Sequence, residues 1–521
     1  MITSVNYRPK FYATAYNPII WSVTSDKVEE VDFKYIFDIY VDGVYINRIK
    51  QRPNPSGAGF IDLSNIINPY VDVGNFANET GTPTSKPFKV GTDAVCSVFM
   101  YVGEEYRNGP FPAALNTYSG TNQIPGGQPA YYLGAQGYSN KPIIALPGSL
   151  DWKDQQTTLQ VQQTNDNDYY GLFGSMAPYL MKSDAIYPPS TCGGVGKFLT
   201  NMPRSVAGGD WQTTPASPSK NFTAKDLLYD RHTLTFLNRN PVYQYKQVGL
   251  TFPYLQSSAP KVAWFEFFNA AGTVIGHYAI GNYDQFGGAP RVNCGDLITT
   301  FDQEVNQEFL SLRVGPKDLE DLGVWVSLGQ IPDHYTVQLF NSLSIASNCS
   351  YSGSPAVPLS ELVTIQVTPD CYSYLYPRTR LVWLNPLGGR EYWNFEMKTE
   401  ETIKADNQEY YQTEIDWSST TPVALTGDTT RNWLKGGMHQ YNKTIHNRYT
   451  ITSDWLLQEE VELLKTAVQS PQCWAYIGES DWPYTCYIAE KEYTSKSIKQ
   501  VKMFNVTFTI ETSVDRTMQT I

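Results

Sequence analysis

Histidine is the side chain that most often acts as an acid, a base or a metal ligand near neutral pH. This chain has five histidines: His232, His277, His334, His439 and His446. None opens an H-E-x-x-H motif and none pairs with another at the spacing of a helical turn, which excludes a zinc-hydrolase helix. His277 and His334 fall in strand-like patterns, where we expect hydrogen-bonded or half-exposed rings.

Two loops have some features of ligand-binding motifs but lack others. Gly193–Lys197 has the glycine and lysine of a phosphate-binding loop, but Thr191 replaces the first glycine and Phe198 replaces the Mg²⁺-binding Ser or Thr. Residues 165–168 (Asn-Asp-Asn-Asp) suggest a calcium loop, yet Ala177 stands where the bidentate glutamate is required. We interpret both loops as turns.

Adjacent carboxylates occur at Glu29-Glu30, Glu104-Glu105 and Glu400-Glu401. Neighbouring side chains in a strand point to opposite faces, so none of these pairs predicts an acid–base dyad. No G-x-S-x-G nucleophile motif occurs either. We therefore predict a non-enzyme without catalytic, cofactor-binding or metal-binding residues. A polysaccharide hydrolase stays an alternative, because a glycosidase needs only two well-placed carboxylates.

The elements that would position these residues are mostly strands. Residues 33–41 and 44–48 alternate apolar and polar side chains around Asp42-Gly43, a pair that predicts a type I′ hairpin turn with positive φ at both positions. Strand patterns return at 232–237, 262–268, 273–275, 334–340, 362–367, 380–384, 392–397 and 504–510. Asp62 or Ser64 is expected to cap a short helix through Ile67.

One longer helix is predicted near the end of the chain. Ser453 or Asp454 would cap it, and Ser470-Pro471 would end it. Leu457, Val461, Leu464 and Val468 would form its apolar stripe.

A long stretch with few charges interrupts the strand patterns. Between Phe111 and Leu150 the only charged residue is Lys141, and glycine and proline are frequent. An uncharged loop that carries tyrosines suits contact with a neighbouring chain, since tyrosine is enriched at protein interfaces. We therefore predict interface residues at Tyr118, Tyr131, Tyr132 and Tyr138.

Composition limits the possible partners and compartments. The net charge of −12 and the absence of a basic run argue against sequence-specific nucleic-acid binding. The seven cysteines form no C-x-x-C pair, so we expect free, mostly buried thiols in a reducing cytosol. The first residues show no signal-peptide pattern, and the longest apolar stretch, 262–280, is broken by polar residues, so no membrane-spanning segment is expected.

These patterns predict a mainly β protein with tandem β-sandwich-like domains. We expect an N-terminal β domain at 1–106 and a Gly/Pro/Tyr-rich insertion with short strands at 107–223. A second β-sandwich domain follows at 224–370, and a small C-terminal α+β domain at 371–521. No repeat of 20–50 residues is evident, which argues against a solenoid or propeller.

Three segments resemble virion structural proteins of short-tailed bacteriophages of Bacteroidetes hosts, including crAss-like phages. The first runs from Tyr16–Trp21 through Asp42-Gly43 to Gly59–Ser64. The second is Arg380–Gly389 with the strand after it. The third runs from Trp455 to the last strand. The resemblance covers about half of the chain and transfers no functional residue.

The resemblance implies a non-enzymatic subunit of an oligomeric neck, ring or tail-hub assembly that forms part of a DNA-ejection conduit. Its expected partners are copies of itself and other neck or tail proteins, with DNA passing through an acidic lumen. The expected location is the virion, after assembly in the host cytoplasm. The alternative to this structural role is a head or tail fibre, or adhesin, that binds host glycans.

Overall fold

The computed structural model confirms a mainly β fold and divides the chain into two compact units. Unit 1 comprises 1–370 and 384–391, and unit 2 comprises 371–383 and 392–521. The structure describes residues 2–7, 12–71, 88–90, 95–107, 109, 115–117, 143–150, 198–202, 222–237, 262–281, 309–340, 360–368, 378–412, 437–478, 483–490, 504–513 and 516–519.

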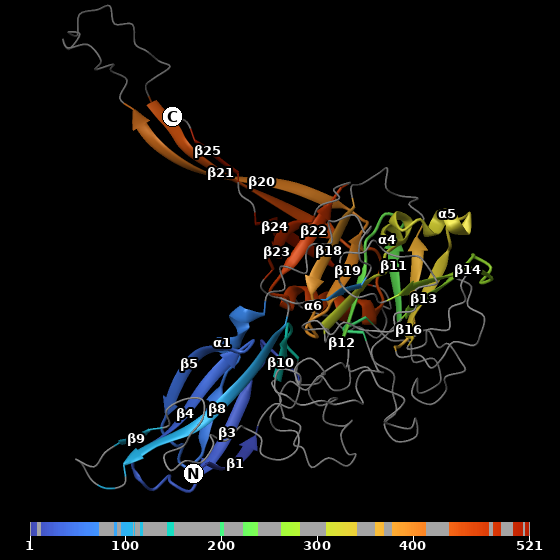
Figure 1. Cartoon of the computed structure of the whole chain (residues 1–521). Coiled ribbons are helices and arrows are strands. Elements are labelled where there is room, and N and C mark those ends of the chain that lie inside the picture. The colour runs from blue at the N-terminus through green and yellow to red at the C-terminus, as the bar shows by residue number, and fades with distance from the viewer. Residues whose placement is uncertain are drawn as a thin grey trace, which may run out of the picture. The chain divides into compact units, whose positions relative to one another are not determined.

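Unit 1 begins with two sheets that share one core (Figure 1). A three-stranded sheet has the order β1 (Ile2–Tyr7), β3 (Ile20–Ser25), β6 (Gly59–Asp62). The second sheet has the order β2 (Tyr12–Thr14), β10 (Ile143–Leu146), β8 (Cys96–Arg107), β4 (Val31–Val41), β5 (Val44–Gln51), with β9 (Leu115–Thr117) beside β8. The short helices α1 (Ser64–Ile67) and η1 (Asn68–Tyr70) follow β6.

Alternation along the strands builds this core. Tyr35, Phe37 and Ile39 of β4 are fully buried, and Trp21 of β3 packs in the same cluster. Gly59 is required beside Tyr35, because a Cβ at that position would lie 2.7 Å from the tyrosine ring. Side chains at alternate positions of the strands therefore fill the core between the two sheets, and the side chains between them point away from that core.

The predicted β4–β5 turn is confirmed. Asp42 has φ +49° and Gly43 has φ +78°, as a type I′ turn requires. The Asp42 carboxylate also accepts a hydrogen bond from the Ser97 amide of β8 (2.8 Å), which links the turn to the sheet. Asp62 accepts a hydrogen bond from the Ser64 amide (2.9 Å). The N-cap of α1 is nevertheless Leu63, which makes no side-chain capping bond, so the prediction that Asp62 or Ser64 caps this helix is wrong: Asp62 still belongs to β6 and Ser64 is already helical.

The rest of unit 1 contains two further sheets. One has the order β11 (Phe222–Leu227), β17 (Val363–Thr368), β16 (His334–Phe340), β13 (Val262–Phe268), β14 (Val274–Gly281). The other has the order β12 (Thr233–Leu237), β15 (Phe309–Arg313), β7 (Phe88–Val90). Phe265, Phe267 and Tyr335 pack with Trp325 of α5 (Val324–Leu328), which follows α4 (Pro316–Asp321).

Residues 384–391 form the tip of a hairpin that belongs to unit 1. Two close approaches explain its Gly388-Gly389 pair. A Cβ on Gly388 would lie 1.9 Å from the Pro147 carbonyl oxygen, and one on Gly389 would lie 2.0 Å from that of Leu199. Only glycine fits where the tip meets these two backbone segments.

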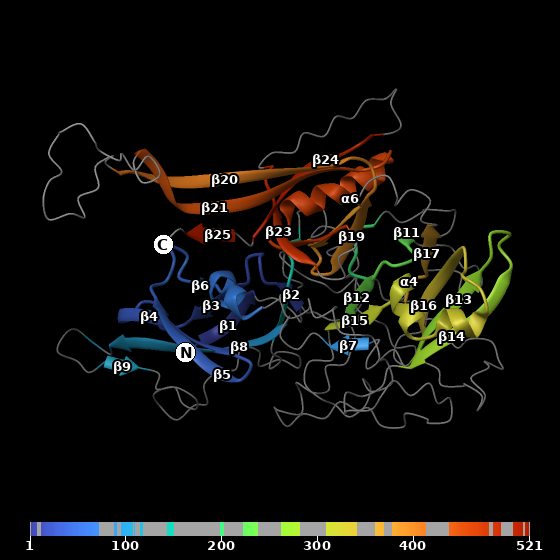
Figure 2. The same cartoon turned by 90° about the horizontal axis from the view of Figure 1, so that it is seen from above.

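The described residues of unit 2 form one sheet and one helix (Figure 2). The strand order is β19 (Arg390–Phe395), β18 (Thr379–Leu384), β22 (Cys473–Ile477), β23 (Tyr484–Ile488), β24 (Thr507–Thr512), β21 (Gly437–Thr452), β20 (Thr399–Gln412), with β25 (Arg516–Gln519) also beside β21. Helix α6 (Gln458–Gln469) is tied to the sheet by Trp383, whose indole N–H donates to the Thr466 hydroxyl (2.8 Å).

The predicted start and stripe of this helix need correction. The helix starts after Leu457, not after Ser453 or Asp454, because Leu456 forms an isolated bridge with Phe504 and keeps that stretch extended. Leu457 is 54% exposed. The residues buried along the helix are Val461, Leu463, Leu464 and Ala467, and Val468 is only partly buried.

Gly389→Ala is expected to destabilise unit 1 by about 1–3 kcal/mol, because the new methyl group overlaps the Leu199 carbonyl and forces the backbone to shift. Gly272→Ala, in another hairpin turn, is the matched control: its φ of +74° is strained, but the space around it is open. Urea unfolding followed by tryptophan fluorescence measures both. An equal loss in the two variants would contradict the close-packing argument.

Candidate interaction surface

Uncharged hydrogen-bond donors surround the buried carboxylate of Glu391 in the interior of unit 1. Its carboxylate accepts hydrogen bonds from the Thr200 hydroxyl (2.9 Å), the Asn201 amide (2.5 Å) and the Asn385 side-chain amide (2.8 Å). Glu391 is 1% exposed. Burial raises the pKa of its carboxyl group, and the hydrogen bonds and the nearby His232 partly offset this effect.

A second buried cluster surrounds His232. Its Nδ1 lies 2.9 Å from the Asp226 carboxylate, and both side chains are 2% exposed. The neighbouring Arg231 bridges Asp318 (2.9 Å) and Asp321 (2.8 Å). These bonds join β11, the two residues just before β12, and α4 across sequence separations of up to 90 residues.

The buried clusters are suited to holding the fold together. A histidine–carboxylate pair and a carboxyl group of raised pKa are typical of active sites. Here, however, all three side chains are almost completely buried, so a substrate has no direct access to them. The three described cysteines, Cys96, Cys473 and Cys486, are also buried and free. Burial raises the pKa of Cys473 to about 12, which keeps it an unreactive thiol at neutral pH.

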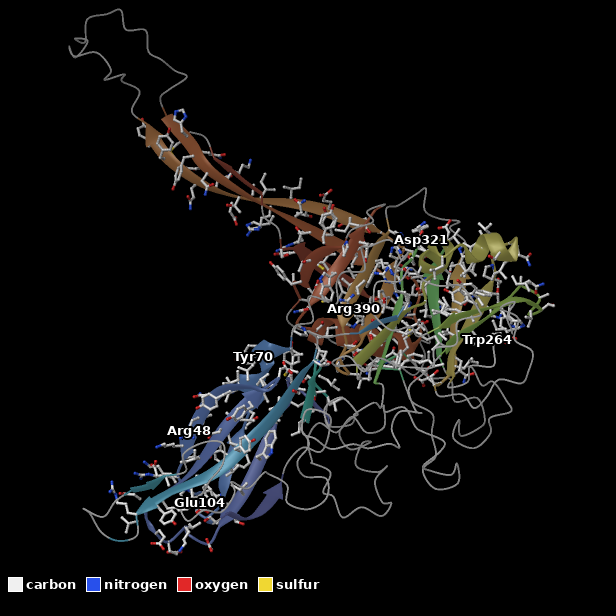
Figure 3. The ribbon with its side chains drawn as sticks, in the orientation of Figure 1. Arg48, Tyr70, Glu104, Trp264, Asp321 and Arg390 are labelled. Carbon is white, nitrogen blue, oxygen red and sulfur yellow. The ribbon has the colours of Figure 1, made fainter. Side chains whose placement is uncertain are left out.

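The outward face of the β4–β5–β8 sheet differs from these clusters because it is partly accessible: the Arg48 side chain is 28% exposed and Tyr45 is 50% exposed. Figure 3 labels Arg48 on this sheet. Tyr40 contacts Tyr45 and Tyr101 edge-on, at ring distances of 5.5 and 5.4 Å. Arg48 makes a bidentate ion pair with the buried Asp38 (2.6 and 2.7 Å). Tyrosine and arginine are the residue types enriched at protein interfaces.

Lysines continue this face beside the arginine. Lys34 and Lys50 both bind Glu105, which is 2% exposed. Glu104 points the other way and accepts from the Ser25 hydroxyl (2.6 Å). The two adjacent glutamates therefore lie on opposite faces, as predicted, and form no dyad. Glu29-Glu30 lies in a turn instead of a strand.

Exposed apolar side chains also gather on β20 and β21, which we call the ribbon. Strand β24 pairs with β21 only at Arg448–Thr452, and β25 only at Asn442–Ile445. In the described residues, positions 437–441 of β21 pair with β20 alone. Figures 1 and 2 show the ribbon extending away from α6 within unit 2.

Large apolar side chains gather on this distal part of the ribbon. Tyr411 and Met438 are opposed across the two strands and are each 63% exposed. Tyr410 stacks on His439 (5.6 Å) and contacts Tyr441 (6.1 Å), and both tyrosines are 45% exposed. A two-stranded hairpin is marginally stable in water on its own. This ribbon therefore has a physical reason to be covered by a partner.

The predicted interface tyrosines, Tyr118, Tyr131, Tyr132 and Tyr138, lie outside the described residues, as do Gly193–Lys197 and residues 165–168. His277 and His334 lie in strands, with half-exposed or hydrogen-bonded rings as predicted. The His277 side chain is 46% exposed and stacks on Trp264 (5.1 Å). His334 is 18% exposed, lies 2.9 Å from the Asp333 carboxylate and stacks on Phe268 (4.9 Å).

Sequence patterns missed the ribbon. β20 is exposed on both faces and most of β21 is half-buried on both faces, so neither strand alternates apolar and polar side chains. The sequence indicates the ribbon only through large apolar side chains near the end of β20, Tyr410 and Tyr411, and near the start of β21, Met438 and Tyr441. The buried Glu391 network was also missed, because Thr200 is 191 residues away in the chain.

Within the described residues, no helix is long and apolar enough to cross a membrane, and no group of three or more His, Cys, Asp or Glu side chains could hold a metal ion. No known family model matches the sequence, and no curated protein matches it at a significant level.

Glu391→Gln is expected to flatten the pH dependence of stability. The folded state keeps the Glu391 proton to a higher pH than the unfolded chain, whose glutamates ionise near 4.5, so the free energy of unfolding falls as pH rises from about 4.5 through the raised pKa. Glutamine keeps the acceptor Oε1 and removes this proton. Urea unfolding at several pH values measures the effect, and an unchanged pH profile would contradict it.

Glu391→Ala is the paired variant. It leaves the Asn201 amide, the Asn385 amide and the Thr200 hydroxyl without their acceptor. The expected loss is about 1–3 kcal/mol for each buried group that stays unsatisfied.

Proposed function

We propose that this chain is a non-enzymatic structural subunit of a homo-oligomeric ring or hub in the neck or tail of a bacteriophage virion. The observation that carries the proposal is the ribbon, which presents large apolar side chains on both faces. The resemblance to virion proteins supports the proposed location in a bacteriophage particle. The ribbon supports the proposed role as a structural subunit that binds its neighbours.

The ribbon fits an arm that holds a neighbouring subunit. Monomeric proteins seldom expose large contiguous apolar patches, and such patches mark interaction sites. A long ribbon places its contact residues away from the subunit's own core, so a neighbour can bind them. The titratable clusters of unit 1 are buried and engaged with each other, which favours a scaffold over a catalyst.

The proposed DNA conduit is supported by the net charge of the chain, and the proposed partners follow from the resemblance to virion proteins. A net charge of −12 suits a conduit that DNA passes without adhering, because like charges repel. The partners proposed are copies of this chain and other neck or tail proteins, assembled in the host cytoplasm and carried in the virion.

Removing the apolar surface of the ribbon is expected to abolish assembly without unfolding the subunit. The variant Tyr410→Ser/Tyr411→Ser/Met438→Ser/Tyr441→Ser should keep the circular dichroism of the wild type and become monomeric in light scattering. The matched control is Val326→Ser/Ile331→Ser, which removes exposed apolar side chains of unit 1 (87% and 54% exposed) and should leave assembly unchanged.

Two results would count against this function. A wild-type chain that stays monomeric at all accessible concentrations would exclude a self-assembling subunit. Selective binding on a glycan array that the ribbon variant loses would favour the adhesin, with the exposed tyrosines stacking on sugars. Electron microscopy of the parent particle would then locate the chain.

A further inference from the structure

We propose that β20 of one subunit adds as an extra antiparallel strand to β5 of a neighbouring copy. This inference rests on the proposed self-assembly and names the two surfaces that meet. The contact would use main-chain hydrogen bonds for affinity and side-chain pattern for specificity, as in other cases of strand addition.

Both strands are sheet edges. β20 ends its sheet after β21, and β5 ends its sheet after β4, and each has only one partner strand in the described part of the chain. β20 has 14 residues and β5 has 8, both long enough for several ladder hydrogen bonds. An edge of this length presents a row of main-chain donors and acceptors to another chain.

Charge selects β5 as the partner. Within β20, Glu400, Glu401, Asp406 and Glu409 outnumber the single Lys404. β5 contains Arg48 and Lys50 and no carboxylate, and the exposed Arg52 follows it. Pairing two copies of β20 would bring like charges together, which is unfavourable. The edge strand β14 has no Asp, Glu, Lys or Arg and offers no such attraction.

The ion pairs within unit 1 leave β5 positive on balance. Asp38 and Glu105 neutralise part of the charge on Arg48, Lys50 and Lys34. These three cations already outnumber the two carboxylates, Arg52 adds a fourth, and the side chains of Arg48 and Lys50 stay 28% and 41% exposed.

The pattern along the two strands sets their direction. β5 begins with exposed apolar side chains, Val44 (62%) and Tyr45 (50%), and ends with its cations. β20 has carboxylates at both of its ends and Asp406 between them, and it finishes with Tyr410 and Tyr411. Antiparallel pairing that sets Tyr45 opposite Tyr411 places Lys50 opposite Asp406. Parallel pairing that keeps Lys50 opposite Asp406 places Tyr45 opposite Glu401 instead, so only the antiparallel direction gives both an aromatic pair and an ion pair. Cross-strand aromatic and opposite-charge pairs are the units that stabilise a sheet.

This contact joins two different surfaces, so it is heterologous. Each added subunit uses the β20 of one neighbour and leaves a β20 of its own for the next. Such a contact closes into a ring when the rotation between subunits permits it, which agrees with the proposed ring or hub.

The test uses the full chain with p-benzoylphenylalanine in place of Tyr411, mixed with an isotopically heavy copy of the same protein. After illumination, mass spectrometry should find light-to-heavy cross-links between position 411 and peptides that contain residues 44–52. Cross-links confined to one isotope would show pairing within a chain, and cross-links to other peptides would show another partner surface. Either result would overturn the inference.

A charge swap gives the second readout. Asp406→Lys or Lys50→Glu alone should weaken assembly about tenfold, and the double variant should recover most of the loss, because opposite charges across an interface are coupled. Lys34 still binds Glu105 when Lys50 is replaced. Glu459→Lys makes a comparable charge reversal at an exposed position on α6 and should have no effect. Assembly that these variants do not alter would overturn the β20–β5 contact alone, whereas a monomeric wild type would overturn the proposed function as well.

Discussion

Unsatisfied main-chain hydrogen-bonding groups at sheet edges are the constraint on which this molecule depends. A mainly β chain must pair its N–H and C=O groups or leave them to water, and every open sheet has two edges. Here the edges β5 and β20 each have one partner strand in the described part of the chain. Carboxylates outnumber cations on β20, whereas β5 contains only cations. Charged side chains on edge strands disfavour the pairing of two identical edges.

The buried carboxylates of unit 1 satisfy main-chain donors in the interior instead of at a sheet edge. Hairpin tips and strand ends bring main-chain donors into the interior of unit 1, and carboxylates accept from them. Glu391 accepts from the Asn201 amide, and Glu361 accepts from the Phe198 amide (2.9 Å). A buried carboxylate that accepts several hydrogen bonds is less costly than unpaired donors. These buried carboxylates therefore link segments that are far apart in the chain. Contacts with other molecules are left to other, exposed residues.

Local sequence was sufficient to predict an element where its pattern is compatible with only one backbone conformation. Asp42-Gly43 predicted positive φ at both turn positions, and the structure has it. The 262–268 and 334–340 strands have the predicted bounds, because alternation and flanking turn residues agree there. The start of α6 was misplaced because Leu456 is held by a bridge to Phe504, a contact 48 residues away that no local cap reveals.

The sequence by itself determined that the chain is mainly β, where most described strands run and which adjacent glutamates would face apart. Those properties depend on neighbours within a few residues. Only the tertiary structure decided that Glu391 is buried with Thr200 and Asn385, that β20 and β21 form an exposed ribbon, and that β5 and β20 are edges. Edge position and burial depend on which distant strands pair, and pairing between distant segments is set by the packing of the whole sheet.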